Sequence, residues 1–159
     1  VHETNLAQKQ VLGEKVAAHF GGDLVGRVIA VWGLAFKPRT DDIRDAPSLD
    51  LIERLLAGGA AVTVFDPEAM DNVRAIHGDR LTYASTAMEA LDGADCLVIV
   101  TEWGDFRRPD FDDMARRMKG RVIIDGRNLY QPQELARRGF TYHGIGKLPV
   151  RGRSRLAVE

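Results

Sequence analysis

Short apolar runs alternate with helix-like stretches along most of the chain. The apolar runs predict strands at residues 28–32, 62–65, 81–83, 97–100, 122–124 and 140–143. The other stretches have helical spacing or helix-forming composition, and they predict helices at residues 5–20, 49–56, 68–76, 86–91, 110–118 and 132–138. Strands that are apolar on both faces and separated by helices require a parallel sheet covered on each side. We therefore predict an α/β fold, a Rossmann-like doubly wound parallel sheet of about five to six strands preceded by one helix.

Glycines and charged residues divide the chain into three predicted parts. Residues 1–22 form a helix that ends at a pair of glycines, and residues 23–147 form the Rossmann-like domain. Residues 148–159 are expected to be a flexible basic tail. The cations in and just before this tail are Lys147, Arg151, Arg153 and Arg155. A phosphate-contacting arm is the weaker interpretation of the same charges.

Composition argues against several classes of function. The 22 basic and 23 acidic residues nearly balance, so the chain has no overall electrostatic attraction to nucleic acid or acidic membranes. Its longest aliphatic run, residues 97–100, is far shorter than the roughly 20 residues of a membrane-spanning helix. The histidines are scattered and there is a single cysteine, so we expect neither a metal site nor an internal disulfide. Without a visible secretion leader, the protein is expected to be cytoplasmic.

The loop after the first predicted strand, residues 33–48, is the first candidate site. Ligands of open α/β sheets bind at the carboxyl ends of strands, near the point where the strand order reverses. The loop is long and charged, but it lacks the three-glycine fingerprint of a dinucleotide site. Its Lys37 and Arg44 offer cations near a helix start, where free amides also favour a phosphorylated ligand. The alternative is that the loop's cations pair with its own carboxylates, namely Lys37, Arg39 and Arg44 with Asp41, Asp42 and Asp45.

Residues at three other strand ends have both a structural and a chemical interpretation. Trp103 and Phe106 can stack on a base or sugar, although core packing is the favoured interpretation. Asp66 ends the second strand, where dinucleotide folds often bind a ribose, and it is at least as well suited to cap the next helix. Cys96 opens a strand that is expected to be buried, which favours a core residue over a nucleophile.

Arg127 lies in the loop after the fifth predicted strand. The neighbouring Gly126 permits a positive φ, which can turn Arg127 across the top of the sheet. An arginine there can bind a phosphate or carboxylate through two hydrogen bonds. An ion pair of Arg127 with Asp125 or with Glu102 is an equal alternative. The residues alone therefore predict a cationic edge of a Rossmann-like sheet, without a catalytic group.

Four motifs lie in order at the ends of the predicted strands. They are Gly33-Leu34-Ala35-Phe36-Lys37-Pro38 with its continuation to Ser48, then Phe65-Asp66-Pro67, Thr101-Glu102-Trp103 and Asp125-Gly126-Arg127-Asn128. Thr4-Asn5-Leu6 and Gln8-Lys9-Gln10 precede them. Together these stretches closely resemble the UDP-glucose/GDP-mannose dehydrogenase family, from residue 1 to about residue 147.

The resemblance implies a nucleotide-sugar 6-dehydrogenase, which oxidises a sugar 6-hydroxymethyl group to a carboxylate with two NAD⁺. The family joins an N-terminal NAD-binding domain, a central helical region with a nucleophilic cysteine, and a C-terminal domain that binds the nucleotide-sugar. This chain resembles the C-terminal domain, and its Thr101-Glu102-Trp103 leans toward the branch that converts UDP-glucose to UDP-glucuronate. Since the nucleophile motif and the glycine fingerprint are absent, this chain alone is expected to be inactive.

Site residues follow from the same resemblance. By position, Phe36, Lys37 and Arg127 resemble the family's contacts to the UDP-sugar. Arg44 resembles the arginine that reaches across the cleft to NAD, which the N-terminal domain mainly binds. The implied partners are a UDP-sugar, the other domains of the same polypeptide and a second copy in a homodimer; neither nucleic acid nor a membrane is expected. The alternative function is a non-catalytic, Rossmann-like nucleotide-binding regulatory module.

Overall fold

The computed structural model describes residues 2–146 and 149–152, with side chains from residue 10 onward. Within these residues, six strands form one sheet in the order β3-β2-β1-β4-β5-β6. The strands are β1 (Val28–Trp32), β2 (Ala61–Phe65), β3 (Thr82–Tyr83), β4 (Cys96–Ile99), β5 (Val122–Asp125) and β6 (Thr141–His143). Every neighbouring pair is parallel. The predicted Rossmann-like parallel sheet is therefore confirmed, and its strand order reverses between β1 and β4.

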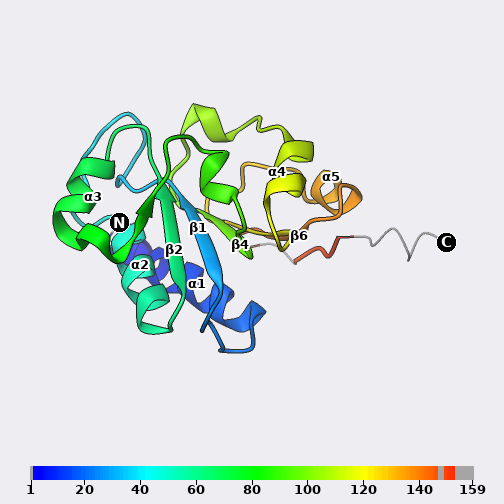
Figure 1. The fold of residues 1–159 in the computed structure, drawn as a ribbon, viewed down its shortest axis with the longest axis horizontal. Helices are drawn as coiled ribbons and strands as arrows, with labels where there is room; N and C mark the ends of the chain where they lie inside the picture. Colours follow the sequence, from blue (N-terminus) through cyan, green and yellow to red (C-terminus); the bar gives the residue numbers. More distant parts are fainter. Residues whose placement is uncertain (1, 147–148, 153–159) are drawn as a thin grey trace.

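Helices cover both faces of this sheet (Figure 1). The α-helices are α1 (His2–His19), α2 (Pro47–Ala57), α3 (Met70–His77), α4 (Phe111–Arg117) and α5 (Pro132–Arg137). Short 3₁₀ helices are η1 (Gly78–Arg80), η2 (Glu89–Leu91) and η3 (Gly104–Phe106). Because each face is covered, the central strands are buried along nearly their whole length, as their continuous apolar sequences require.

Two apolar clusters, one on each face, hold the layers together. On one face, Leu51, Ile52 and Leu55 of α2 pack with Leu12 and Val16 of α1. On the other face, an aromatic cluster lies beneath α4 and α5 and includes Trp32, Phe106, Phe140 and Tyr142. The rings of Trp32 and Phe106 stack with their centroids 4.8 Å apart. This packing fixes the positions from which the loops at the carboxyl ends of the strands depart.

Two of the predicted helices start two or more residues later in the structure than expected. The helix predicted at residues 68–76 begins only at Met70, because Asp66 accepts the backbone N–H groups of Glu68 and Ala69 in a turn. The helix predicted at residues 86–91 was wrong over its first half, and only residues 89–91 are helical, as the short 3₁₀ helix η2. There Thr86 accepts the N–H of Glu89, and this side-chain bond competes with a regular helical start.

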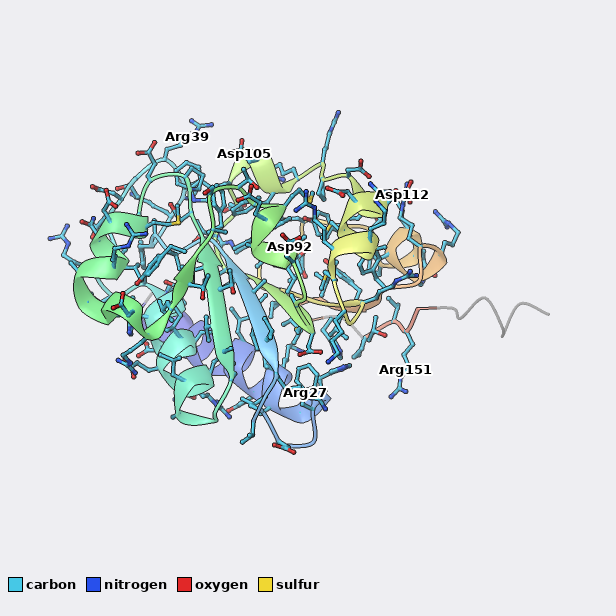
Figure 2. All side chains as sticks on the ribbon, viewed as in Figure 1. Arg27, Arg39, Asp92, Asp105, Asp112 and Arg151 are labelled. Atoms are coloured by element: carbon cyan, nitrogen blue, oxygen red, sulfur yellow. The ribbon has the colours of Figure 1, made fainter. Side chains whose placement is uncertain are left out.

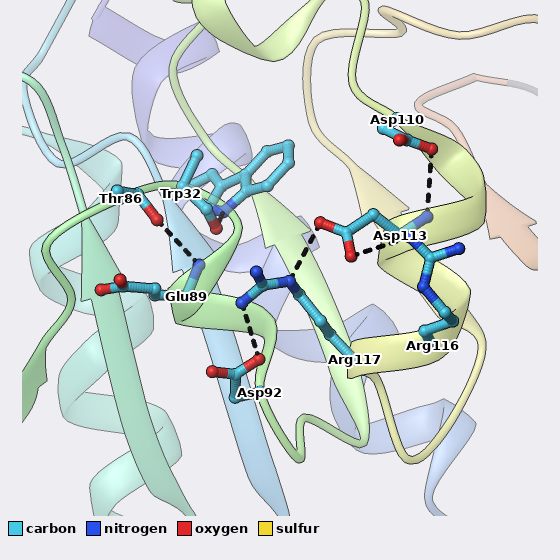
Figure 3. A network of polar contacts seen from close by, with 9 residues as sticks. Trp32, Thr86, Glu89, Asp92, Asp110, Asp113, Arg116 and Arg117 are labelled. Carbon is cyan, nitrogen blue, oxygen red and sulfur yellow. Dashed lines mark hydrogen bonds and ion pairs between the residues drawn. The ribbon is translucent and has the colours of Figure 1, made fainter.

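A polar network fastens η2 and α4 to the sheet (Figure 3). The Trp32 indole donates to the carbonyl of Ala87 at 2.9 Å. Arg117 of α4 donates to Asp92 and to Asp113, each at 3.0 Å. Arg117 therefore links α4 to the turn that leads into β4.

The chain continues past β6 and turns back along the edge of the sheet. Tyr142 and Val150 form an antiparallel bridge with backbone hydrogen bonds of 2.8 and 3.0 Å. Of the basic tail expected from residue 148 onward, residues 148 and 153–159 lie outside the described residues, as does Lys147. The proposed division at residues 22 and 147 stays a prediction.

The described residues contain no helix that combines the length and the apolar character needed to cross a membrane. Within the same residues, no three metal-binding side chains come together in a group that could hold an ion.

Candidate functional site

A hollow of about 480 Å³ opens at the carboxyl ends of β1 and β4. It is lined by residues from the loops that follow these two strands, namely Lys37, Pro38, Arg39, Glu102, Trp103, Gly104 and Arg107. Figure 2 shows Arg39 and Asp105, one from each loop, at the same end of the molecule. Because the strand order reverses between β1 and β4, the hollow lies where ligands of open α/β sheets bind.

The buried side chain of Asp66 fixes the loops that line the hollow. Its side chain is 1% exposed. Its oxygens accept N–H groups at 2.7–3.2 Å from the backbones of Leu34, Ala35, Glu68 and Ala69 and from the indole of Trp103. Asp66 therefore ties together the loops that follow β1, β2 and β4. With both oxygens engaged, it does not fit the role of a ribose ligand in a dinucleotide site. It does not cap α3 either, because the N-cap of α3 is Ala69 without a side-chain hydrogen bond, and the N–H groups that Asp66 accepts from Glu68 and Ala69 precede the helix.

Two hydroxyl groups and a glycine add to this rigidity. Ser48 donates to the carbonyl of Leu34 and Thr101 donates to the carbonyl of Ala35, each at 2.6 Å. Gly33 has a φ of +92°, and a Cβ atom there would lie 2.6 Å from the Cβ and backbone nitrogen of Thr101. The loops after β1 and β4 are thus in direct contact, which only glycine permits at position 33.

The aromatic residues of the β4 loop pack into the protein. Trp103 is 9% exposed and Phe106 is fully buried. The structure therefore favours the core-packing interpretation for both. The exposed aromatic side chain near the hollow is instead Phe36, at 46% exposure, on the β1 loop.

The side chains of Lys37 and Arg39 form no hydrogen bond or ion pair with any described residue. Both line the hollow, and Arg39 adopts a positive φ of 64°. The alternative in which these two cations form ion pairs with carboxylates of their own loop is therefore not observed in the described part of the chain, although the charge of Lys37 is a minor cause of the lowered pKa of Asp42. Lys37 is a cation available to an anionic ligand.

Arg44, by contrast, is paired within its own loop. Its guanidinium donates to both oxygens of Asp42, at 3.0 and 2.9 Å. These hydrogen bonds lower the pKa of Asp42 to about 2. Arg44 does not line the hollow, and its side chain is 88% exposed just before α2. Of the three predicted cations Lys37, Arg44 and Arg127, only Lys37 lines the hollow.

Arg127 does not line the hollow itself, but it contacts Glu102, which does. Its Nη2 donates to Glu102 Oε1 at 2.6 Å, and Glu102 Oε2 accepts from Arg107 at 3.3 Å. The buried Asp125 does not pair with the guanidinium, because it accepts the backbone N–H of Arg127 instead. Of the two ion pairs that the sequence allowed, the structure forms the one with Glu102.

The single cysteine has no place in this site. Cys96 is fully buried in β4, and burial raises the pKa of its thiol far above the ordinary value. A thiol in this environment stays protonated and behaves as a core residue.

Sequence reasoning missed the parts of the site that depend on contacts between loops. It named Glu102 only as a pairing alternative, and it did not single out Arg107. The acid and the two arginines come from positions 102, 107 and 127, which only the fold brings together. The five donors around Asp66 were also missed, although the turn sequence Asp66-Pro67 after a strand signals that a loop-forming carboxylate is present.

A protein family model matches most of the sheet and its loops. The model is described as the UDP binding domain of the UDP-glucose/GDP-mannose dehydrogenase family, and it matches residues 30–132. The matched segment contains both sides of the hollow, together with Asp66 and Arg127.

Individual proteins agree with this match. The chain is 46% identical over 152 residues to the UDP-glucose 6-dehydrogenase of Pseudomonas aeruginosa, covering 92% of this chain and 34% of that protein. It is 46% identical over 140 residues to the enzyme of Rhizobium meliloti, covering 88% and 32%. The solved structure of a UDP-glucose dehydrogenase from Pyrobaculum islandicum superposes with a TM-score of 0.75 at 33% identity, covering 90% of this chain and 30% of that one. The chain thus spans about a third of the length of these relatives, and it belongs to the UDP-glucose/GDP-mannose dehydrogenase family.

Proposed function

We propose that this chain is the C-terminal, UDP-sugar-binding part of an NAD-dependent UDP-glucose 6-dehydrogenase. The observation that carries the proposal is the hollow at the β1–β4 switch, with Lys37 in its wall. Lys37 makes no hydrogen bond or ion pair to a described residue, and its charge contributes only as a minor cause to the lowered pKa of Asp42. A nucleoside diphosphate is the chemistry that fits a concave, cationic site of this kind.

The proposed roles are those that the family resemblance implies, and the placement of Lys37 in the wall of the hollow is compatible with them. Lys37 donates to the diphosphate, and the half-exposed ring of Phe36 covers an apolar face of the ligand. Arg127 approaches from the β5 loop and contacts the nucleotide part. These residues bind and orient the substrate, and none of them transfers a proton or forms a covalent bond.

The oxidation itself depends on groups outside this chain. The Asp66 carboxylate is engaged by N–H groups and the β1 loop lacks the glycine fingerprint, so this domain does not fit NAD in the usual dinucleotide manner. NAD, which accepts hydride when bound, is therefore assigned to the N-terminal domain, and Arg44 contributes from the rim. A cytoplasmic location and a homodimer of the full-length enzyme stay predictions.

The first test is binding of UDP-glucose to the 159-residue chain, measured by calorimetry. Lys37→Ala and Arg127→Ala should each raise the dissociation constant by roughly 10- to 150-fold, because each removes a charge-assisted hydrogen bond worth about 1.5–3 kcal/mol. Lys119→Ala and Arg121→Ala are the matched controls, since both residues are exposed and lie outside the hollow. Equal affinities for all four variants and the wild type would refute the proposal.

A second test concerns Arg44 in a full-length enzyme that carries this chain as its C-terminal third. Arg44→Ala should raise the Michaelis constant for NAD several-fold and leave that for UDP-glucose nearly unchanged. The reverse pattern would reassign Arg44 to the sugar-nucleotide.

A further inference from the structure

Glu102 is the one carboxylate among the residues that line the hollow. Its two oxygens accept from two different arginines, Arg127 at 2.6 Å and Arg107 at 3.3 Å. Lys37 and Arg39, from the loop after β1, line the same hollow. An acidic side chain in a hollow lined by cations lowers the positive potential that an anionic ligand meets.

The pairing with Arg127 leaves most of the guanidinium unused. Only Nη2 contacts Glu102, and within the described residues the side chain of Arg127 has no second partner. A guanidinium can donate five N–H groups, and a phosphate accepts them in the same geometry as a carboxylate but with more charge. A phosphate oxygen can therefore take the place of Glu102 Oε1 without rebuilding the loop.

Releasing Glu102 also has a low cost. The Glu102 and Arg127 side chains are each 32% exposed, so water can hydrate the carboxylate once its partner is gone. Exposed and half-exposed ion pairs contribute little net stability, because solvent competes with them.

We propose that Glu102 occupies the phosphate position of the hollow in the free protein and yields Arg127 to the ligand's diphosphate on binding. This proposal rests on the proposed function and assigns Glu102 the role of a specificity-determining residue. Every ligand must displace the same carboxylate, and a diphosphate offers more charge for that exchange than an uncharged nucleoside. Glu102 thus lowers the affinity for all anionic ligands. It also raises the negative charge that a ligand must carry to displace the carboxylate from Arg127.

The test compares the binding of UDP and of uridine to the wild-type chain and to Glu102→Gln. Glutamine keeps an oxygen acceptor for Arg127 and removes the charge. We expect UDP to bind about tenfold more tightly to Glu102→Gln and uridine to bind equally to both proteins. The gain should shrink as salt rises from about 0.05 to 0.5 M, because the removed repulsion is screened.

Asp105→Asn is the matched control, since it makes the same change in net charge on an exposed neighbour that does not line the hollow. It should change UDP affinity by less than about twofold. Unchanged or weaker UDP binding by Glu102→Gln would overturn the inference. If Lys37→Ala still weakens UDP binding in that case, the proposed function stands and only the role of Glu102 falls. If Lys37→Ala has no effect, the proposed function itself is wrong.

Discussion

At the scale of single residues, two buried carboxylates shape the carboxyl edge of the sheet. Asp66 and Asp125 each accept backbone N–H groups from the loop that follows their strand, and neither pairs with a cation in the described part of the chain. Oriented backbone N–H groups therefore stabilise the two carboxylates, as they do for an acidic residue at a helix N-cap. Both residues serve to position loops, although a carboxylate at a strand end is also the usual place for a ligand contact.

Asp66→Asn should lower the free energy of unfolding by about 3 kcal/mol. The amide loses the charge and directs its own N–H groups at the donors that Asp66 accepts. Urea unfolding measures this cost. Asp71→Asn is the control, because Asp71 is 96% exposed and its pair with Arg74 spans 3.8 Å. A change as small as that of Asp71→Asn would argue against a structural role for Asp66.

Gly33→Ala should cost about 3 kcal/mol, since the new Cβ meets the backbone of Thr101 and the φ of +92° disfavours any side chain. Gly93→Ala separates the two causes, because Gly93 has a φ of +72° with nothing within 4 Å of the added atom. That control should lose only about 1 kcal/mol. Equal losses in urea unfolding would show that the contact with Thr101 carries no energy.

At the scale of elements, apolar pattern alone located every strand. The first strand was predicted with its observed bounds, because its five apolar residues are followed by Gly33, whose φ of +92° ends the extended backbone. The start of α5 follows equally well from a proline at the first helical position. Errors arose where side chains bond the local backbone, as Thr86 does before η2. Such bonds depend on a turn geometry that periodicity does not encode.

The site was predictable in part and for a different reason. Lys37 and Arg127 were singled out because they follow strands whose carboxyl ends meet at one edge, and their roles stay predictions. The freedom of Lys37 and the bridging by Glu102 were not predictable, since each requires knowing which charges of distant loops come within reach. The loop contains similar numbers of cations and carboxylates. The sequence therefore could not indicate that Arg44, and not Lys37, forms the ion pair within this loop.

Arg117 offers a test of how α4 is attached. Arg117→Gln should lower the free energy of unfolding by about 1 kcal/mol, because it breaks contacts with both Asp92 and Asp113 (Figure 3). Arg116→Gln removes one contact from a side chain that is 68% exposed, and it should cost less than about 0.5 kcal/mol. Thermal unfolding of both variants compares them, and a larger effect at Arg116 would contradict the assignment.

At the scale of the whole molecule, mild acid should destabilise the fold through three of its histidines. Burial is the main cause that lowers the pKa of His19, His77 and His143 below the ordinary value of 6.5. The unfolded chain therefore binds protons near pH 6.5 while the folded chain does not. The resulting stability is complete above that pH and is lost as the pH falls through 6.5 toward the folded pKa values.

Urea unfolding at pH 7.5 and 5.5 measures this loss. The free energy of unfolding should be lower at pH 5.5, and His143→Gln should reduce the difference, because His143 has a buried Nε2 without a hydrogen-bond partner. A free energy of unfolding that is constant or rises on acidification would exclude these histidines as the source.

The bridge between Tyr142 and Val150 has a consequence for self-association. An open strand edge is a template onto which another chain can add, and sheet proteins that leave one exposed tend to aggregate. Here the returning segment occupies backbone groups of β6 on one side, and the opposite edge is the two-residue strand β3. Within the described residues, neither edge offers a long row of unpaired backbone groups to a neighbouring molecule. We therefore expect any assembly of this domain to use its helices and loops in preference to its strand edges.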